Sequence, residues 1–331
     1  MKKEMTPRQR VIKTLRHEEP DRVPIDFGSS HNCSIHLDAY LNLRKYLGIK
    51  GEYNPEFISF VDQCVKPDEE VLVKLGIDTR GINYSKPRYF KEKIWRENDR
   101  EFREDMYGVI WEKPDHVGIW NIAKYPLADK TPEEIKNYSK FFDPHDPGLT
   151  EGLRERGRKL FEETDYAIVA DIQAGSVIEA VWFITGLVRY LEDMACEPET
   201  IRPLCDRINE IYKTVSRRMM AELENFAQVI MANGDLGTQE SLLISPALYR
   251  SFLKPYERDF YGYLKSISNV PVIRHSCGSI MEILPDFIEC GIDGIHPVQV
   301  SAKGMDTTIL KEKYGKQLVF WGGIDTHRVL P

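Results

Sequence analysis

Short apolar runs alternate with helical segments through the second half of the chain, and this alternation constrains the fold more than any other feature. The apolar runs lie at residues 167–170, 228–232, 271–274, 294–297 and 317–321. Helices are predicted over about 177–194, 199–224, 279–289 and 305–314, with a further helix after Ser245-Pro246. Strands that alternate with helices at this spacing form a parallel sheet. We therefore predict a (β/α)8 barrel (TIM barrel), with an open doubly wound sheet as the alternative.

The first half of the chain is less regular. Thr6-Pro7 predicts the start of a helix that runs to about His17, and residues 24–28 are predicted to form a short strand. Residues 88–125 are rich in aromatic residues that alternate with charges, a pattern typical of antiparallel strands or hairpins. We expect residues 1–331 to form a single barrel domain with an N-terminal extension and with 88–125 as a hairpin insertion. Because the chain stops at Pro331, we expect the last unit of the barrel to be incomplete or residues to be lost.

Charge and hydropathy exclude several partners. The formal net charge is -7, whereas a nucleic-acid-binding face is basic, so we expect no nucleic acid partner. No segment approaches the roughly 20 apolar residues that span a bilayer, and the charged N-terminus does not resemble a secretory signal. We therefore expect a cytoplasmic protein with no membrane partner. The six cysteines show no disulfide spacing, which predicts free thiols or metal ligands.

Polar residues follow the predicted strands, and in barrels the carboxyl ends of the strands carry the working residues. Each one taken alone is better explained as a helix cap or a loop residue, roles that Asp, Asn and Gly favour. Their repetition across six strands favours a shared pocket. The candidates are Asp26, Asp171, Gln173, Asn233, Asp235, His275, Cys277, His296, Gln299, Trp321 and Asp325.

His275 and Cys277 are the most informative pair among these candidates. Residues i and i+2 of a strand point to the same side, so an imidazole and a thiol converge at the end of the strand at 271–274. Both groups are preferred zinc ligands, although a buried cysteine beside a core histidine is the plain alternative. Two ligands do not complete a site. The candidates for a third ligand are Asp235, Glu240, His296 and a cysteine beyond Pro331, while Cys290 is discounted because it falls on a covering helix.

Several short motifs together resemble the uroporphyrinogen decarboxylase superfamily. They are 235–239 (DLGTQ), 243–246 (LISP), 252–256 (FLKPY), 275–278 (HSCG), 297–300 (PVQV) and 320–325 (FWGGID), with 6–10 (TPRQR) and 21–24 (DRVP) near the N-terminus. The resemblance covers nearly the whole chain and implies a (β/α)8 barrel with an N-terminal extension. One branch of this superfamily, the decarboxylases, carries an arginine-bearing loop after the first strand. Residues 27–32 contain no arginine.

The other branch contains corrinoid-linked methyltransferases similar to methylcobamide:coenzyme M methyltransferases, which carry a His-x-Cys pair and a distant cysteine as zinc ligands. The resemblance therefore implies a zinc-dependent methyltransferase that moves a methyl group from a corrinoid protein to a thiol or folate-type acceptor. His275 and Cys277 would bind zinc, and Asp235 would complete or tune the site. Asp171 would act beside Asp235 in catalysis. Asp26, Gln299, Trp321 and His296 would line the substrate pocket.

Two other functions stay open from the sequence. The chain could be a uroporphyrinogen decarboxylase, in which Asp26 or Asp171 stabilises a protonated pyrrole and Arg80 grips carboxylates. It could also be a non-catalytic barrel that binds a partner. The intact His275 and Cys277 weigh against that last function, since a binding module has no need of them.

Overall fold

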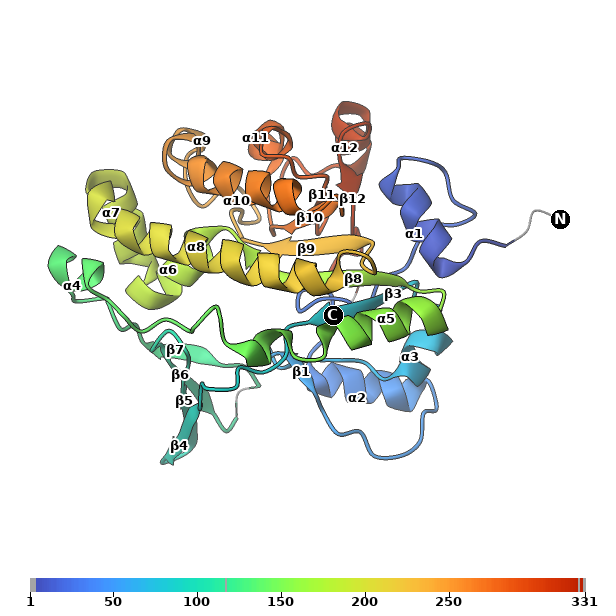
Figure 1. Ribbon diagram of the computed structural model, residues 1–331, viewed down its shortest axis with the longest axis horizontal. Coiled ribbons are helices and arrows are strands. Elements are labelled where there is room, and N and C mark those ends of the chain that lie inside the picture. Colours follow the sequence, from blue (N-terminus) through green and yellow to red (C-terminus); the bar gives the residue numbers. More distant parts are fainter. Residues whose placement is uncertain (1–3, 117, 327, 330–331) are drawn as a thin grey trace.

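A parallel sheet of six strands forms the centre of the computed structural model, which describes residues 4–116, 118–326 and 328–329 (Figure 1). The strand order is β12-β11-β10-β9-β8-β3, and all five neighbouring pairs are parallel. The strands are β3 (Thr79–Asn83), β8 (Ala167–Gly175), β9 (Val229–Asn233), β10 (Val272–His275), β11 (Gly294–His296) and β12 (Val319–Phe320). The predicted parallel sheet is therefore confirmed.

Helices follow these strands, as the alternation predicts. They are α5 (Leu153–Glu163), α6 (Val177–Thr185), α7 (Leu187–Cys196), α8 (Pro198–Leu223), α9 (Pro246–Leu248), a π-helical turn (Tyr249–Leu253), α10 (Lys254–Ile267), a 3-10 turn (Met281–Ile283), α11 (Leu284–Glu289) and α12 (Thr307–Tyr314). Figure 1 shows α8 and α10 side by side. The helix predicted over 177–194 is divided in two at Gly186, whose φ of +86° a helix does not allow.

Both faces of the parallel sheet are buried, which explains the nearly continuous apolar strands. Alternate residues of each strand point to opposite sides, so Ile168 and Ala170 join the large core beneath the helices. Ala167 and Val169 point the other way, into a small cluster that includes Val11 from α1 (Pro7–Leu15). This helix begins at the predicted cap Thr6 and ends at Leu15, slightly earlier than expected.

The predicted strand at residues 24–28 is wrong, because this segment has no strand pairing. Pro24 has no backbone N–H to donate, and Gly28 has a φ of +75°, so the segment is poorly suited to a ladder. It contacts the two outer strands in another way. Asp26 accepts hydrogen bonds from the hydroxyl of Thr79 at the start of β3 and, at 2.8 Å, from the indole N–H of Trp321 just after β12. Within the described residues, β3 and β12 do not pair with each other.

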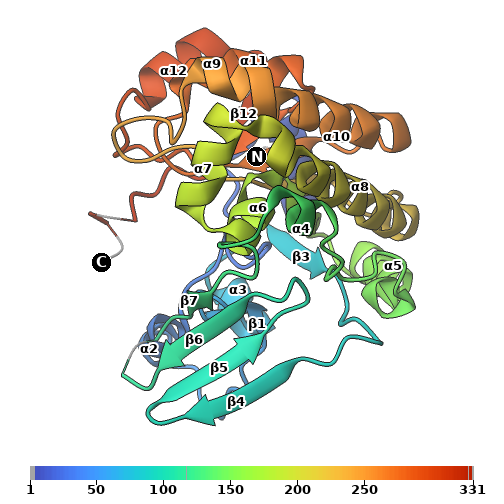
Figure 2. The ribbon, with the colours of Figure 1, turned by 90° about the vertical axis from the view of Figure 1, so that its left-hand side faces the viewer.

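A second, antiparallel sheet lies beside the main fold (Figure 2). Its strands are β4 (Lys93–Glu97), β5 (Arg100–Glu104), β6 (Ile110–Pro114) and β7 (Asn121–Lys124), in that order. These are the antiparallel strands expected within 88–125. The buried Trp111 anchors the sheet to the rest of the protein through edge-on contacts with Phe60 at 5.4 Å and Phe183 at 5.5 Å.

The remaining elements are short and lie in the first half of the chain. They are α2 (Leu37–Tyr46), β1 (Phe57–Ser59), β2 (Cys64–Val65), α3 (Glu69–Lys74), α4 (Pro132–Lys136) and a 3-10 turn (Pro147–Thr150). Residues 36–76 therefore contain two helices, α2 and α3, and a two-stranded hairpin of β1 and β2. Among the described helices, none combines the length and apolar character needed to cross a membrane.

Candidate metal centre

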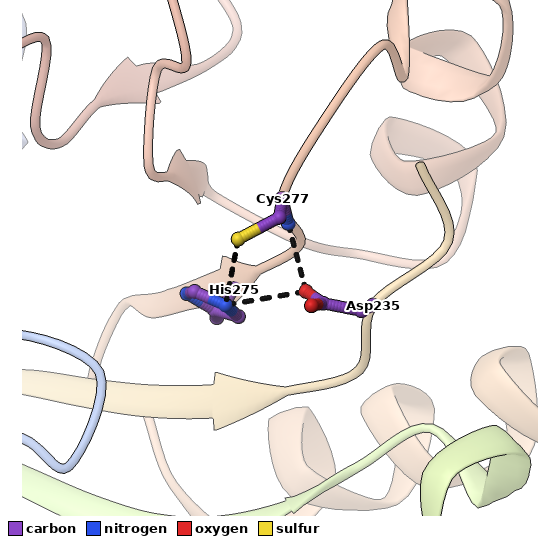
Figure 3. Close-up of side chains that lie close together, drawn as sticks. All are labelled: Asp235, His275 and Cys277. Carbon is purple, nitrogen blue, oxygen red and sulfur yellow. Dashed lines mark hydrogen bonds and ion pairs between the residues drawn. The ribbon is translucent and has the colours of Figure 1, made fainter. Parts of the chain in front are cut away.

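The carboxyl ends of β9 and β10 bring three potential metal ligands together (Figure 3). His275 is the last residue of β10, and Cys277 follows it two positions later. Asp235 lies two residues beyond the end of the neighbouring strand β9. Parallel strands present their carboxyl ends at the same edge of a sheet, so these side chains meet although Asp235 and Cys277 are 42 positions apart.

The ligand atoms of the three side chains all lie within 4.8 Å of one another. His275 Nε2 is 3.2 Å from Asp235 Oδ1 and 3.6 Å from Cys277 Sγ. The backbone N–H of Cys277 donates a 2.8 Å hydrogen bond to Asp235 Oδ1, which fixes the carboxylate against the turn after β10. The imidazole is buried, whereas Asp235 and Cys277 are half-buried and remain open to a ligand.

Close packing of two loops holds this arrangement in place. Gly278, directly after Cys277, has a φ of +84°, and a Cβ there would lie 2.4 Å from the backbone carbon of Gly237. Only glycine combines that conformation with so close an approach. The loop after β9 and the loop after β10 therefore touch through their backbones, and the glycine of the His-Ser-Cys-Gly motif has a packing function.

The electrostatics of the centre show an excess of negative charge. Burial, with the nearby charges of Asp235 and Glu179, raises the pKa of the Cys277 thiol to about 12. Burial and the charge of Asp235 raise the pKa of Glu179 to about 7. Burial also acts to raise the pKa of Asp235, but hydrogen bonds from His275 and the Cys277 backbone keep that pKa below its ordinary value. A cation bound here would offset this charge.

The donor types and two of the three ligand separations fit zinc. A tetrahedral zinc ion with Zn–N and Zn–O bonds of about 2.1 Å and Zn–S bonds of about 2.3 Å places its N and S ligands about 3.6 Å apart and its N and O ligands about 3.4 Å apart. The corresponding distances here are 3.6 Å and 3.2 Å. Imidazole, thiolate and carboxylate are also the three ligand types that zinc takes from proteins. Glu240, another candidate for the third ligand, lies outside this group.

His296, predicted as a substrate contact or third ligand, lies on the Nδ1 side of His275, away from Asp235 and Cys277. It pairs in register with His275 across β10 and β11, and the two Nδ1 atoms are 2.8 Å apart. Its Nε2 is 3.4 Å from Cys33 Sγ. Burial and the neighbouring histidines lower the pKa of His296 well below its ordinary value, which keeps the ring neutral.

Gln299 supports the same turn from the other side. Its side-chain oxygen accepts a 2.7 Å hydrogen bond from the Gly278 backbone, and its amide donates to Gln239 at 2.8 Å. Asp26 and Trp321 were both predicted to line the pocket. The indole N–H of Trp321 donates a 2.8 Å hydrogen bond to Asp26, so these polar atoms already have a partner within the protein.

Asp171 forms a dyad with a histidine that the sequence analysis did not single out. The fully buried Asp171 accepts from the backbone N–H of His31 at 2.9 Å and lies 2.8 Å from His31 Nδ1. Burial acts to lower the pKa of His31, but the charge and hydrogen bond of Asp171, together with the charges of Glu179 and Asp62, outweigh burial and raise that pKa. No described residue hydrogen-bonds His31 Nε2.

Sequence reasoning missed His31, Cys33 and Glu179. His31 lies in residues 27–32, which were considered only for their lack of arginine, and Cys33 follows directly. Glu179 in the first turn of α6 accepts from Asn233 at 2.8 Å, which itself accepts from Asn32 at 3.0 Å. A polar run after an apolar segment was the available signal for the first two, whereas an acidic residue in a first helical turn is too common to be one.

Comparison with known proteins agrees with this fold. No curated protein matches the chain. The fold is similar to that of a methyltransferase from Methanosarcina mazei, with a TM-score of 0.55 and 16% sequence identity over 95% of this chain and 82% of that chain. Residues 173–330, which contain Asp235, His275 and Cys277, match the family model of uroporphyrinogen decarboxylase (URO-D). The resemblance to the uroporphyrinogen decarboxylase superfamily that the motifs predict is thus confirmed over residues 173–330.

Proposed function

We propose that this protein is a zinc-dependent methyltransferase that moves a methyl group from a methyl-corrinoid protein to a thiol or a similar acceptor. The convergence of Asp235, His275 and Cys277 carries this proposal. Three protein ligands leave the fourth position of a tetrahedral zinc ion open for a substrate, as in catalytic rather than structural sites. The methyltransferase from Methanosarcina mazei, which has a similar fold, supports the same class of reaction.

The reaction needs a thiolate, and an ordinary thiol, with a pKa of about 8.5, is mostly protonated at neutral pH. Zinc, when bound, would lower the pKa of an acceptor thiol at its open position. With methyl-corrinoid as the donor substrate, the acceptor sulfur would form a bond to the methyl carbon, the cobalt–carbon bond would break, and its electron pair would stay on cobalt. His275 and Cys277 would hold the metal, and Asp235 would complete the ligand set.

The proton released by the acceptor needs a base. We assign this task to the His31–Asp171 dyad, because Asp171 orients the imidazole through Nδ1 and leaves Nε2 without a partner among the described residues. An imidazole held in this way is the usual general base near neutral pH. Asp171 then acts through His31 and does not need to touch the substrate. Gln299 would keep Cys277 in place through the Gly278 backbone.

We also propose that the parallel sheet belongs to a (β/α)8 barrel formed by the whole chain, with 88–125 as an insertion. The segment 24–28 supports this closure, since Asp26 hydrogen-bonds Thr79 of β3 and Trp321, which follows β12. The corrinoid protein would dock at the barrel mouth, beside the carboxyl ends of β9 and β10. A folate-type compound is the alternative acceptor, and the cytoplasm is the expected location.

Uroporphyrinogen decarboxylase activity is the second candidate, because the matching family carries that name. That activity requires basic side chains that grip substrate carboxylates. Arg80, the residue proposed for this task, is buried and committed elsewhere. Its guanidinium binds Glu69 at 2.6 and 2.8 Å, donates to two backbone carbonyls and stacks on Tyr166 at 3.5 Å. The methyltransferase is therefore the function that the side chains support better.

Metal analysis tests the proposal directly. Protein made under zinc-replete conditions without a histidine tag is analysed as wild type, as Cys277→Ser and as Cys196→Ser, a matched control at an exposed cysteine. We expect about one zinc per chain in the wild type and the control and a large loss in Cys277→Ser. Methyl transfer from methylcobalamin to thiols should follow the zinc content. A wild type without zinc would contradict the proposal and would call for assays with porphyrinogen substrates.

A further inference from the structure

Two buried histidines face each other beside the proposed zinc ligands. His275 ends β10 and His296 ends β11, and the strand register places them directly opposite. Their ring centroids are 5.0 Å apart, and the two Nδ1 atoms approach to 2.8 Å. This is a hydrogen-bonding distance, so the Nδ1–H of one ring donates a hydrogen bond to the unprotonated Nδ1 of the other.

A single proton between the two Nδ1 atoms links the tautomers of the rings. His275 Nε2 faces Asp235 and Cys277, so it must be free of a proton to bind a metal. The proton of His275 then lies on Nδ1 and is donated to His296 Nδ1. His296 consequently carries its own proton on Nε2, which points toward Cys33 Sγ at 3.4 Å. The thiol sulfur is a weak acceptor at a suitable distance.

We propose that His296 is a positioning residue that selects the metal-binding tautomer of His275. Cys33 Sγ accepts the hydrogen bond of His296 Nε2–H and ends this row of hydrogen-bonded side chains. This inference rests on the proposed zinc function. Ligating histidines in proteins donate their second N–H to a fixed partner, and loss of that partner weakens metal binding by about 10- to 100-fold. The proposal gives His296 a task other than the substrate contact expected from the sequence.

The same groups have a second arrangement without metal. His275 Nε2–H donates to Asp235 Oδ1, His275 Nδ1 accepts from His296 Nδ1–H, and the Cys33 thiol donates to His296 Nε2. Each of the three side chains, His275, His296 and Cys33, keeps one proton in both arrangements, so the three residues together lose none. Binding of zinc therefore changes the tautomers of His275 and His296 together.

Zinc affinity tests the positioning role. The variant His296→Leu removes the acceptor, and we expect its zinc dissociation constant to rise about 10- to 100-fold. The variant His296→Asn puts a side-chain oxygen near the place of Nδ1 and should recover most of the affinity. His17→Asn is the matched control and should leave the affinity unchanged, because the one side-chain hydrogen bond of His17 among the described residues goes to the Gly315 carbonyl.

Nitrogen-15 NMR of histidine-labelled protein reads the tautomers directly, with His296→Asn used to assign the His296 signals. We expect His296 to be protonated on Nε2 with zinc and on Nδ1 without it. An unchanged His296 tautomer, or His296→Leu with wild-type affinity, would overturn this inference and leave the zinc function standing. A wild type that binds no zinc would remove both. If His296→Leu does not fold, judged by circular dichroism, the NMR result on the wild type decides.

Discussion

A buried ion pair supports the strand that carries the metal centre. Arg274, one residue before His275, binds Glu257 of α10 at 2.7 Å, and both side chains are 0% exposed. Tyr249 donates a 2.8 Å hydrogen bond to the other oxygen of Glu257, and the Arg274 guanidinium lies 4.2 Å from the ring centre of Phe287. Arg274 also donates to the His275 carbonyl at 3.2 Å. We predict that this pair is strongly coupled.

The variant Arg274→Met fills a similar space but leaves the Glu257 carboxylate buried without its partner charge. Removal of one member of such a pair costs about 3–5 kcal/mol. Unfolding of 331 residues has an entropy of about 0.7 kcal/mol per °C, so the melting temperature should fall by about 4–7 °C. In the double variant Arg274→Met with Glu257→Gln, the orphaned charge is absent. Its total cost should be at least about 2 kcal/mol less than the sum of the two single variants.

Thermal and urea denaturation of the wild type, both single variants and the double variant give the coupling energy. Arg96→Met is the matched control, since Arg96 and Asp115 form a comparable pair whose side chains are 56% and 53% exposed. The control should change stability by less than about 1 kcal/mol. Additive single effects, or a cost of Arg274→Met no larger than that of Arg96→Met, would refute the reasoning.

Three further predictions concern the centre and its surroundings. Asp235→Asn should weaken zinc binding by at least about 100-fold, because a neutral amide replaces a carboxylate ligand; titration calorimetry that finds unchanged affinity would remove Asp235 from the ligand set. Gly278→Ala should destabilise the protein and lower its zinc content, whereas Gly48→Ala, at a positive φ with open space around it, should cost only about 1 kcal/mol; equal costs would contradict the close backbone packing. Since Asp171 raises the pKa of His31 in the folded protein, the pair stabilises the fold below about pH 6.5, and this contribution is lost as the pH rises through the raised value. The melting temperature of the wild type relative to His31→Asn should therefore fall from about pH 6.5 upward, and a constant difference would count against the pair.

Local patterns predicted much of the fold. Apolar runs that alternate with helical segments indicated a parallel sheet, because side-chain periodicity depends only on neighbours along the chain. For the same reason, Thr6-Pro7 and Ser245-Pro246 correctly predicted helix starts. The segment at 24–28 was predicted as a strand from local composition alone, and that prediction was wrong. Its backbone groups have no ladder partner, and Asp26 contacts the two outer strands through its side chain instead.

The sequence by itself determined that His275 and Cys277 share a side, since this follows from the two-residue period of a strand. Only the tertiary structure decided that Asp235 joins them, that His296 faces His275 in register, and that Cys33 reaches His296 from 263 positions away. It also decided that His31 pairs with Asp171 across 140 positions. The order and register of the strands fix these contacts, and they depend on packing between distant segments rather than on any local pattern.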